Sequence, residues 1–343
     1  MGRTYREAGV DIEEARRAVE LIGQAAASTA TSAVLGGIGG FGSLFRLDTG
    51  PYPFPVLVAS TDGVGTKLKV AIALGRHDTI GVDLVHHCIN DIAVQGADPL
   101  FFLDYLATGR LRADVAEEIV GGIAAACAAS GVALVGGETA ELPDLYQGDD
   151  FDLAGFIVGV VARRDVIDGT GVRAGDALIG LPSSGLHTNG YSLARRVLRR
   201  DEWDKHVSGI ERTIGQELLE PHRSYLDEIR ILRRALRDAG SDVLAFAHIT
   251  GGGWVDNIPR TLPAELGVEV ETGSWRVPRI FSLIQERGDI ADDEMVRTFN
   301  LGIGLTAVVH PEQVDVALRA VPEGVRVGTV VPAASDGPRV AFL

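Results

Sequence analysis

Short apolar runs that end in turns rich in glycine alternate with segments of helical period along most of the chain. Strands are predicted at residues 56–59, 100–106, 132–135, 153–161, 177–181, 243–247, 268–271, 303–309 and 326–331. Helices are predicted at residues 11–27, 78–95, 114–129, 192–200, 221–237, 278–286 and 311–320. This alternation favours layers of helices packed on sheets, and the 43 glycines suit many tight turns between strands and helices. The predicted fold class is therefore α/β (α+β).

The length of 343 residues exceeds what a single hydrophobic core usually supports, so two domains are expected. A polar stretch with several glycines, residues 163–176, separates a first half dominated by strands from a second half of alternating strands and helices. We therefore predict an N-terminal domain at residues 1–168 and a C-terminal α/β domain at residues 169–343.

The charge balance argues against a polyanionic partner. Lysine and arginine number 32 against 47 aspartates and glutamates, which gives a formal net charge of -15. DNA or RNA would be repelled by such a chain, so no nucleic acid partner is expected. No apolar run approaches the roughly 18 residues of a membrane helix, and the first residues do not form an apolar signal region, so we expect a cytoplasmic protein without a membrane partner.

The two cysteines, Cys88 and Cys127, both fall in predicted helices and show no metal-binding spacing. We therefore expect two buried thiols and no disulfide or zinc framework.

A phosphate-binding turn is predicted at the end of the first strand, in the segment Asp62-Gly63-Val64-Gly65-Thr66-Lys67. The glycines Gly63 and Gly65 permit close approach of the backbone to an anion, Thr66 offers a hydroxyl, and Lys67 offers a positive charge. The segment lacks the order of a P-loop, which excludes that class of NTPase. Taken alone, such a turn is more often structural than functional.

A second glycine-rich segment formally matches the dinucleotide pattern GxGxxG, but it lacks the preceding strand and following helix that the pattern requires. Its glycines would still let the backbone fold over phosphates, with a plain surface loop as the alternative. Residues 18–45 contain no lysine or arginine, so Lys67 would have to supply the positive charge. The candidates in this loop are Gly37, Gly39, Gly40, Phe41 and Gly42.

Three carboxylates at predicted strand ends or on a polar helix face are candidate Mg²⁺ ligands: Asp62, Asp91 and Glu138. Mg²⁺ prefers hard oxygen ligands and is usually held by one or two carboxylates together with phosphates and water. Glu138 follows the strand of residues 132–135, which we expect to stop at Gly136 and Gly137. In the helix of residues 78–95, four polar residues share one face, namely Asp83, His87, Asn90 and Asp91. Each carboxylate taken singly could also be a solvated side chain or a helix cap.

Two turns in the second half combine histidine with small polar residues or glycine. One contains Ser184, His187 and Asn189 and precedes a predicted helix, and the other contains His248 followed by Gly251 and Gly252. Turns of this kind favour an anion, and imidazole titrates near neutral pH. A single histidine at a strand end is more often a structural hydrogen-bonding residue, but two such turns in one domain favour ligand binding.

Taken together, these segments resemble the PurM-like superfamily and, within it, the phosphoribosylformylglycinamidine cyclo-ligase family. The resemblance spans nearly the whole chain and rests on the joint order of the segments. They are residues 5–12, 36–42, 62–67, 77–84, 101–105, 136–141, 183–191, 248–253 and 297–300.

The resemblance implies a two-domain fold in which the N-terminal mixed sheets of a homodimer form a barrel-like core, with a C-terminal α/β domain beside it. It also implies ATP-dependent cyclisation of formylglycinamidine ribonucleotide to 5-aminoimidazole ribonucleotide, with release of ADP and phosphate. ATP and Mg²⁺ are the implied cofactors, the metal held by the three carboxylates above.

The resemblance further implies roles for individual residues. Lys67 would neutralise charge on the transferred phosphoryl group, and His187 and His248 would orient substrate or transfer protons. The implied contacts with nucleotide include Gly136, Gly137 and Thr139, and those with substrate include Ser184, Asn189, Gly251 and Gly252.

Relatives within the superfamily provide the alternatives. The positions of the cysteines argue against enzymes that make selenophosphate and against hydrogenase maturation. Thiamine monophosphate kinase remains an enzymatic alternative. A non-catalytic subunit that binds nucleotide remains an alternative of another class.

Overall fold

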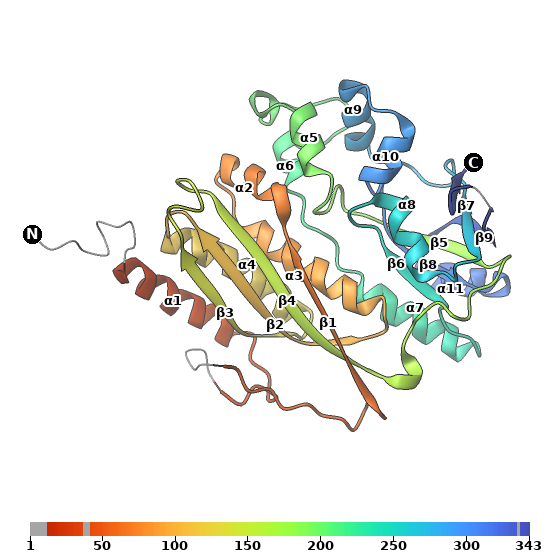
Figure 1. Ribbon diagram of the computed structural model, residues 1–343, viewed down its shortest axis with the longest axis horizontal. Coiled ribbons are helices and arrows are strands. Elements are labelled where there is room, and N and C mark those ends of the chain that lie inside the picture. The colour runs from red at the N-terminus through yellow and green to blue at the C-terminus, as the bar shows by residue number, and fades with distance from the viewer. Residues whose placement is uncertain (1–11, 37–41, 335–336) are drawn as a thin grey trace, which may run out of the picture. The chain divides into compact units, whose positions relative to one another are not determined.

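The computed structural model describes residues 12–36, 42–334 and 337–343, which form two compact units (Figure 1). Unit 1 contains the described residues of Met1–Ile92 and Ala97–Asp165. Unit 2 contains Ala93–Gly96 and the described residues of Val166–Leu343. Each unit holds one sheet packed with helices, which confirms the predicted α/β class.

Unit 1 contains a sheet of four strands in the order β1-β4-β2-β3. Strands β2 and β3 run parallel, whereas β4 is antiparallel to both β1 and β2, so the sheet is mixed as predicted. All four strands lie where apolar runs predicted them, although each is longer than its apolar run. Their bounds are β1 (Pro55–Gly63), β2 (Asp98–Thr108), β3 (Ala133–Glu141) and β4 (Phe151–Ala162).

Strand β3 corrects the expectation that the strand stops at two glycines. It continues through Gly136 and Gly137, after a bulge at which Phe102 pairs with Leu134 but Leu103 pairs with Gly136. A Cβ atom added at Gly137 would lie 2.2 Å from an oxygen of the Asp104 carboxyl group on β2. Glycine is present here because no side chain fits beside Asp104, and the strand is retained despite its low propensity.

The helices of unit 1 include three predicted from sequence and one that was not. Helices α1, α3 and α4 begin and end close to their predicted bounds, whereas α2 was missed because it is short. In Figure 1, α3 and α4 lie side by side along the sheet. The bounds are α1 (Ile12–Ala27), α2 (Leu68–Leu74), α3 (Asp78–Ala93) and α4 (Ala113–Ala129).

Two glycines fix the contact between α3 and α4. A Cβ atom at Gly81 would lie 2.2 Å from the carbonyl oxygen of Ile119, and one at Gly122 would lie 2.3 Å from that of Asp78. The two helix backbones can approach this closely only because both positions lack a side chain. This contact holds α3 in place and so positions its polar face.

Unit 2 contains a mixed sheet of six strands in the order β10-β7-β9-β5-β8-β6. Only β10 and β7 pair in parallel among these neighbours. Every residue of β8 is buried, which matches its continuous apolar run. The strands are β5 (Ala177–Pro182), β6 (Ala245–His248), β7 (Leu266–Val270), β8 (Ile303–Val309), β9 (Val325–Pro332) and β10 (Val340–Phe342).

The helices of unit 2 are mostly short. They are α5 (Tyr191–Val197), α6 (Ile214–Leu218), α7 (Leu226–Asp238), α8 (Gly253–Asn257), α9 (Arg279–Gly288), α10 (Asp292–Thr298) and α11 (Val314–Ala320). Single 3₁₀ turns occur in both units, at Gly65–Lys67, Arg163–Asp165, Arg200–Glu202, Ile258–Thr261 and Pro311–Gln313.

Helix α7 starts five residues later than predicted. The segment before it is held by the end of β5 instead: the Ser184 hydroxyl donates to the carbonyl oxygen of Pro221 at 2.6 Å, and the Tyr225 hydroxyl donates to that of Pro182 at 2.9 Å. These tertiary hydrogen bonds keep residues 221–225 out of the helix, although their sequence permits one.

Both cysteines are free and buried, in agreement with the sequence. Across the described ranges, no helix is both long and apolar enough to cross a membrane.

Candidate functional site

A buried ion pair lies directly beyond the end of β1. Lys67 occupies the 3₁₀ turn Gly65–Lys67, and its Nζ donates a hydrogen bond of 2.8 Å to Oδ1 of Asp83 on α3. Neither side chain has solvent-exposed area. Burial lowers the pKa of Lys67, and the charge and hydrogen bond of Asp83 partly oppose that shift. The ammonium group that sequence assigned to phosphate therefore contacts a carboxylate of its own chain in this structure.

Asp62, at the end of β1, is tied to both its own backbone and α3. Its Oδ1 accepts a hydrogen bond of 2.7 Å from the Gly63 N–H, and its Oδ2 lies 2.7 Å from Nε2 of His87. Burial by itself would lower the pKa of His87, but the hydrogen bond to Asp62 and nearby carboxylates, including Asp91, outweigh it and raise the pKa. The Asp62 side chain is only partly buried, so its oxygens remain accessible to a ligand.

Asp91 lies on the same face of α3, and its Oδ2 accepts a hydrogen bond of 3.1 Å from the Ser60 hydroxyl on β1. The structure thus places the predicted ligands Asp62 and Asp91 on the facing sides of one strand and one helix. It also confirms the polar face of α3, because Asp83, His87 and Asp91 all contact β1 or the turn that follows it. Their carboxylate oxygens are hard donors and fit Mg²⁺.

Glu138 is not brought to this pair within one chain. The strand register aligns Asp62, Gly155, Asp104 and Gly137 in one row across the sheet, and Glu138 stands in the next row. Successive residues of a strand point to opposite faces, so Glu138 faces away from the side that carries Asp62 and α3. Three strand spacings of ~4.8 Å separate β1 from β3, which is about 14 Å.

Asp104 was not among the predicted site residues, although it stands in the same row, between Gly155 and Gly137. Its side chain is buried, and burial raises its pKa to about 7. A carboxyl group that titrates near neutral pH at this position is a functional candidate. The feature that could have identified Asp104 is its position as an acidic residue within the otherwise apolar segment of residues 100–106.

Of the glycine-rich segment, residues 36–42, only the first and last residues are among those described. Gly37, Gly39, Gly40 and Phe41 lie outside the described residues. Gly42 is described and exposed, and the hydroxyl of the next residue, Ser43, donates to the carbonyl oxygen of Val135 at 2.5 Å. This contact ties the end of the loop to β3, immediately before Gly136 and two residues before Gly137. Thr139 follows on β3, opposite Leu106 of β2.

The remaining residues of the first turn lie together at the end of β1. Gly63 is the last residue of the strand, and Gly65 begins the 3₁₀ turn with φ +68°. This left-handed conformation suits glycine, and it lets the chain turn sharply before Thr66 and Lys67.

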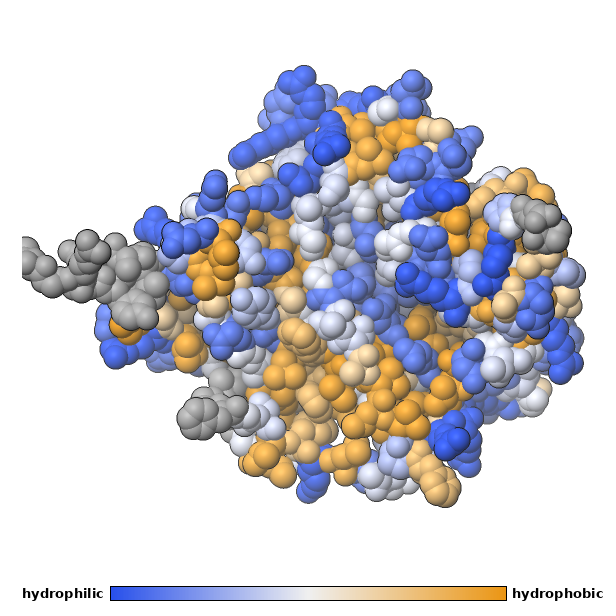
Figure 2. All heavy atoms as spheres, viewed as in Figure 1, coloured by the Kyte–Doolittle hydropathy of each residue, from blue (hydrophilic) through white to orange (hydrophobic). Residues whose placement is uncertain are grey.

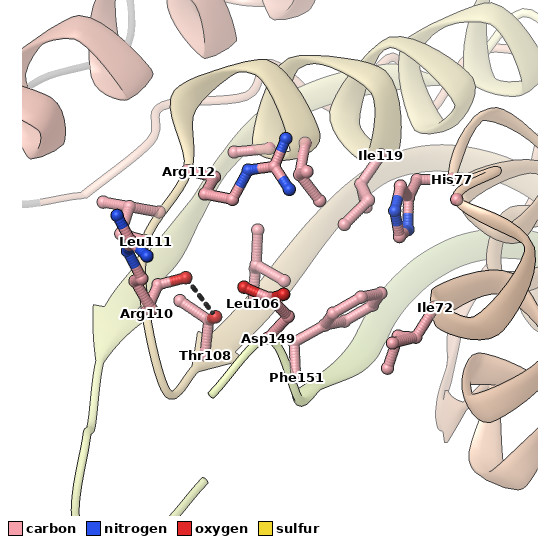
Figure 3. Close-up of a pocket in the computed structure, with 13 residues that line it drawn as sticks. Ile72, His77, Leu106, Thr108, Arg110, Leu111, Arg112, Ile119, Asp149 and Phe151 are labelled. Atoms are coloured by element: carbon pink, nitrogen blue, oxygen red, sulfur yellow. Dashed lines mark hydrogen bonds between the residues drawn. The ribbon is translucent and has the colours of Figure 1, made fainter. Parts of the chain in front are cut away.

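Unit 1 also contains a separate cavity of about 110 Å³, shown in Figure 3. It lies between the end of β2, the start of β4 and the first turns of α4. Its walls are mainly apolar, and the polar groups around it include His77, Arg110 and Asp149. Nδ1 of His77 is buried and has no hydrogen-bond partner among the described residues. The described lining contains no predicted site residue, so this cavity is distinct from the candidate site.

In unit 2 the two predicted turns lie next to each other. A Cβ atom at Gly251 would lie 3.2 Å from Oδ1 of Asn189, which places the second turn against the first. Gly252 caps the start of α8 with φ +90°. His187 has φ +63°, an unfavourable conformation for a residue with a side chain, and its Nε2 accepts a hydrogen bond of 3.3 Å from the Ser184 N–H. Backbone strain of this kind is found preferentially at functional sites.

His248, at the end of β6, contacts a histidine that sequence did not single out. Its Nε2 lies 3.0 Å from Nε2 of His222, and the ring of His222 stacks on that of His187 with centroids 3.9 Å apart. His222 lies in the segment that was predicted to be helical but is held as a loop before α7. A single histidine in a supposed helix offered no signal of this cluster.

Comparison with solved structures defines the class of fold. A hydrogenase maturation protein HypE in complex with ATP matches with a TM-score of 0.65 and 17% identity, over 92% of this chain and 88% of that one. The thiamine-monophosphate kinase from Stenotrophomonas maltophilia K279a matches with a TM-score of 0.66 and 20% identity, over 94% of this chain and 95% of that one. At such identity the likeness concerns the fold alone, which is PurM-like.

Comparison of sequences defines the family. Residues 52–161 match the N-terminal domain of AIR synthase related proteins, and residues 173–340 match their C-terminal domain. The chain therefore belongs to the AIR synthase related family.

Individual relatives within this family show which of its proteins the chain is similar to. A phosphoribosylformylglycinamidine cyclo-ligase from Desulfitobacterium hafniense is 52% identical over 92% of this chain and 91% of the relative. Proteins of the same name from Nitrosococcus oceani and Myxococcus xanthus are 50% and 53% identical. Those matches cover 99% and 93% of this chain, and 94% and 92% of the relatives.

Proposed function

We propose that this chain converts formylglycinamidine ribonucleotide to 5-aminoimidazole ribonucleotide in purine biosynthesis, with conversion of ATP to ADP and phosphate. The observation that carries the proposal is identity of 50% or more, over at least nine tenths of both chains, to relatives named phosphoribosylformylglycinamidine cyclo-ligase. Binding of ATP is supported further by the fold, which is shared with a HypE in complex with ATP and with AaThiL complexed with AMPPCP and TMP.

The chemistry needs ATP because the formyl oxygen of the substrate is a poor leaving group. Transfer of the γ-phosphoryl group to that oxygen forms a phosphorylated imidate and releases ADP. An amidine nitrogen of the same molecule then attacks the formyl carbon, phosphate leaves with the former formyl oxygen, and a proton is lost. The protein has to position the two groups, neutralise phosphate charge and accept that proton.

We assign the nucleotide phosphates to the turn after β1, with Asp62 and Asp91 as Mg²⁺ ligands. Their side chains lie on the facing sides of β1 and α3, where His87 contacts Asp62 and the Ser60 hydroxyl donates a hydrogen bond to Asp91. The bound metal would neutralise phosphate charge. Lys67, the last residue of the 3₁₀ turn, holds this turn against α3 through its ion pair with Asp83 and is the lysine that we assign to the phosphates. The glycine-rich segment, Gly136, Gly137 and Thr139 complete the assigned nucleotide contacts.

Glu138 completes a metal site only if a second copy of the chain presents it. It faces the side of the sheet opposite to α3, and this side also carries the apolar residues Leu57 and Phe156. These side chains are 59% and 43% exposed, and Figure 2 shows apolar residues gathered over β1 and β4. We therefore propose a homodimer that covers this face, as a large exposed apolar patch favours. Sedimentation of the pure protein tests it.

We assign the formylglycinamidine ribonucleotide to the paired turns of unit 2. Ser184, Asn189, Gly251 and Gly252 offer polar groups and backbone that can approach closely. His187 and His248 are the proposed groups for orienting substrate or accepting the proton lost on cyclisation. The proposed location is the cytoplasm.

Incubation with two different substrates tests the proposed function against its alternatives. The purified protein is mixed with Mg²⁺, ATP and either formylglycinamidine ribonucleotide or thiamine monophosphate. We expect ADP and an aromatic amine in equal amounts with the first substrate, and no thiamine diphosphate with the second. Formation of thiamine diphosphate would support the kinase alternative. ATP binding without either product would support a non-catalytic subunit.

A further inference from the structure

Three buried histidines cluster in unit 2. Each of His187, His222 and His248 offers a ring nitrogen, and these three atoms all lie within 4.8 Å of one another. The exposed fractions of the residues are only 1%, 1% and 6%. Three buried imidazoles at this spacing are a donor set that transition metals prefer.

The fold brings the three rings together from separate segments. His187 stands in the turn after β5, His222 in the loop before α7, and His248 at the end of β6. Gly304 on β8 leaves space for them, because a Cβ atom there would lie 2.4 Å from Cε1 of His187. His187 itself has a left-handed φ of +63°, which is unfavourable for a residue with a side chain.

We propose that His187, His222 and His248 bind a divalent transition-metal ion, with Zn²⁺ the best fit. Two nitrogens bound tetrahedrally to Zn²⁺ at 2.0–2.1 Å stand about 3.3 Å apart. Nε2 of His222 and Nε2 of His248 are already 3.0 Å apart, and their rings are inclined by 56°. Metal binding therefore requires the two Nε2 atoms to move apart by a few tenths of an ångström. It also requires the His187 ring to rotate, so that it no longer stacks on the ring of His222.

The donor set also separates this site from the proposed Mg²⁺ site of unit 1. Mg²⁺ prefers carboxylate, phosphate and water oxygens, whereas imidazole nitrogens suit Zn²⁺, Co²⁺, Ni²⁺ and Cu²⁺. Three histidines leave a fourth tetrahedral position for water or a substrate oxygen. With the ion bound, His187 and His248 would orient substrate through the metal and would not accept its proton. The two sites therefore differ in the metals that they select.

The test is a titration of the metal-free, full-length protein with Co²⁺, followed by visible absorption. We expect one equivalent of tetrahedral Co²⁺ that added Zn²⁺ displaces, and loss of this absorption in His222→Ala. The matched control is His206→Ala, which removes an exposed histidine of the same unit and should bind as the unaltered protein does. No tetrahedral Co²⁺ in the unaltered protein, or full binding by His222→Ala, would overturn the proposal.

A crystal of the unaltered protein soaked in Zn²⁺ keeps the test decisive if His222→Ala fails to fold. Anomalous scattering at the zinc edge should place one ion among the three rings. A crystal without that peak, at a Zn²⁺ concentration that loads other surface sites, would overturn the proposal.

Discussion

Nζ of Lys67 lies 2.8 Å from Oδ1 of Asp83, and neither side chain has any exposed area. The pair joins the turn after β1 to the polar face of α3, next to the residues assigned to Mg²⁺. A buried ion pair costs desolvation energy, so its presence beside the proposed nucleotide site suggests a role in holding this turn in position.

Loss of Lys67 should destabilise unit 1. Lys67→Met leaves the Asp83 carboxylate buried without its cation, at a cost of about 3–5 kcal/mol in the free energy of unfolding. Lys69→Met is the matched control, because the ion pair of Lys69 with Asp150 is partly exposed and is worth under about 1 kcal/mol. Urea unfolding measures both. Equal losses of unfolding free energy in the two variants would contradict the expected difference between the buried and the exposed ion pair. The double variant Lys67→Met/Asp83→Leu removes both charges and should recover most of the stability.

Asp62→Asn should lower the pKa of His87. The substitution removes the charge and much of the hydrogen bonding that raise this pKa, while the burial that lowers it remains. Histidine NMR titration measures the shift, and Asp144→Asn, at an exposed position, is the control. An unchanged pKa of His87 in Asp62→Asn would show that Asp62 does not control it.

The same contact sets a pH dependence of stability. Because the folded pKa of His87 is raised, its stabilising contribution is fully present below the unfolded value of about 6.5. It is lost as the pH rises through the folded pKa. The stability advantage of the unaltered protein over Asp62→Asn should therefore shrink with rising pH across this window.

Asp104 should make stability fall with rising pH. Its pKa is raised from 3.8 to about 7 in the folded chain, so the folded state holds a proton that the unfolded state has lost. Relative to Asp104→Asn, stability should fall by about 1.4 kcal/mol per pH unit between these values and become level above about pH 7. Thermal unfolding at pH 5, 6, 7 and 8 (about one unit apart) resolves this slope. A constant difference across that range would contradict the raised pKa.

Neighbouring glycines of α4 should respond in opposite ways to alanine. Gly122→Ala places a Cβ atom 2.3 Å from the carbonyl oxygen of Asp78 and should cost about 1–3 kcal/mol of stability. Gly121→Ala meets nothing within 4 Å and should stabilise the helix by about 0.5–1 kcal/mol. Denaturant unfolding compares the two. If both variants are stabilised, α3 and α4 do not touch as described.

Much of the fold was predictable because the signals were local and periodic. The polar face of α3 follows from helical spacing. In the structure the polar residues on this face point toward β1 and the turn after it. The end of β3 was not predictable, because two consecutive glycines usually indicate a turn. The reason for glycine at position 137 is the Asp104 side chain on the neighbouring strand, which no local sequence pattern reveals.

The candidate site was predictable only where two adjacent elements carry it. Asp62 and Asp91 lie on the facing sides of β1 and α3, whereas the row and face of Glu138 depend on strand order and a bulge. His222 escaped notice because hydrogen bonds from Ser184 and Tyr225, which lie outside any sequence pattern, hold its segment out of α7.

Transfer of labelled oxygen tests the proposed reaction most directly. Formylglycinamidine ribonucleotide with ¹⁸O at its formyl oxygen is turned over with ATP and Mg²⁺, and the phosphate is examined by mass spectrometry. We predict one ¹⁸O atom in each phosphate released, with one phosphate formed for each 5-aminoimidazole ribonucleotide. Unlabelled phosphate, or ATP hydrolysis without the aromatic amine, would contradict the proposed reaction.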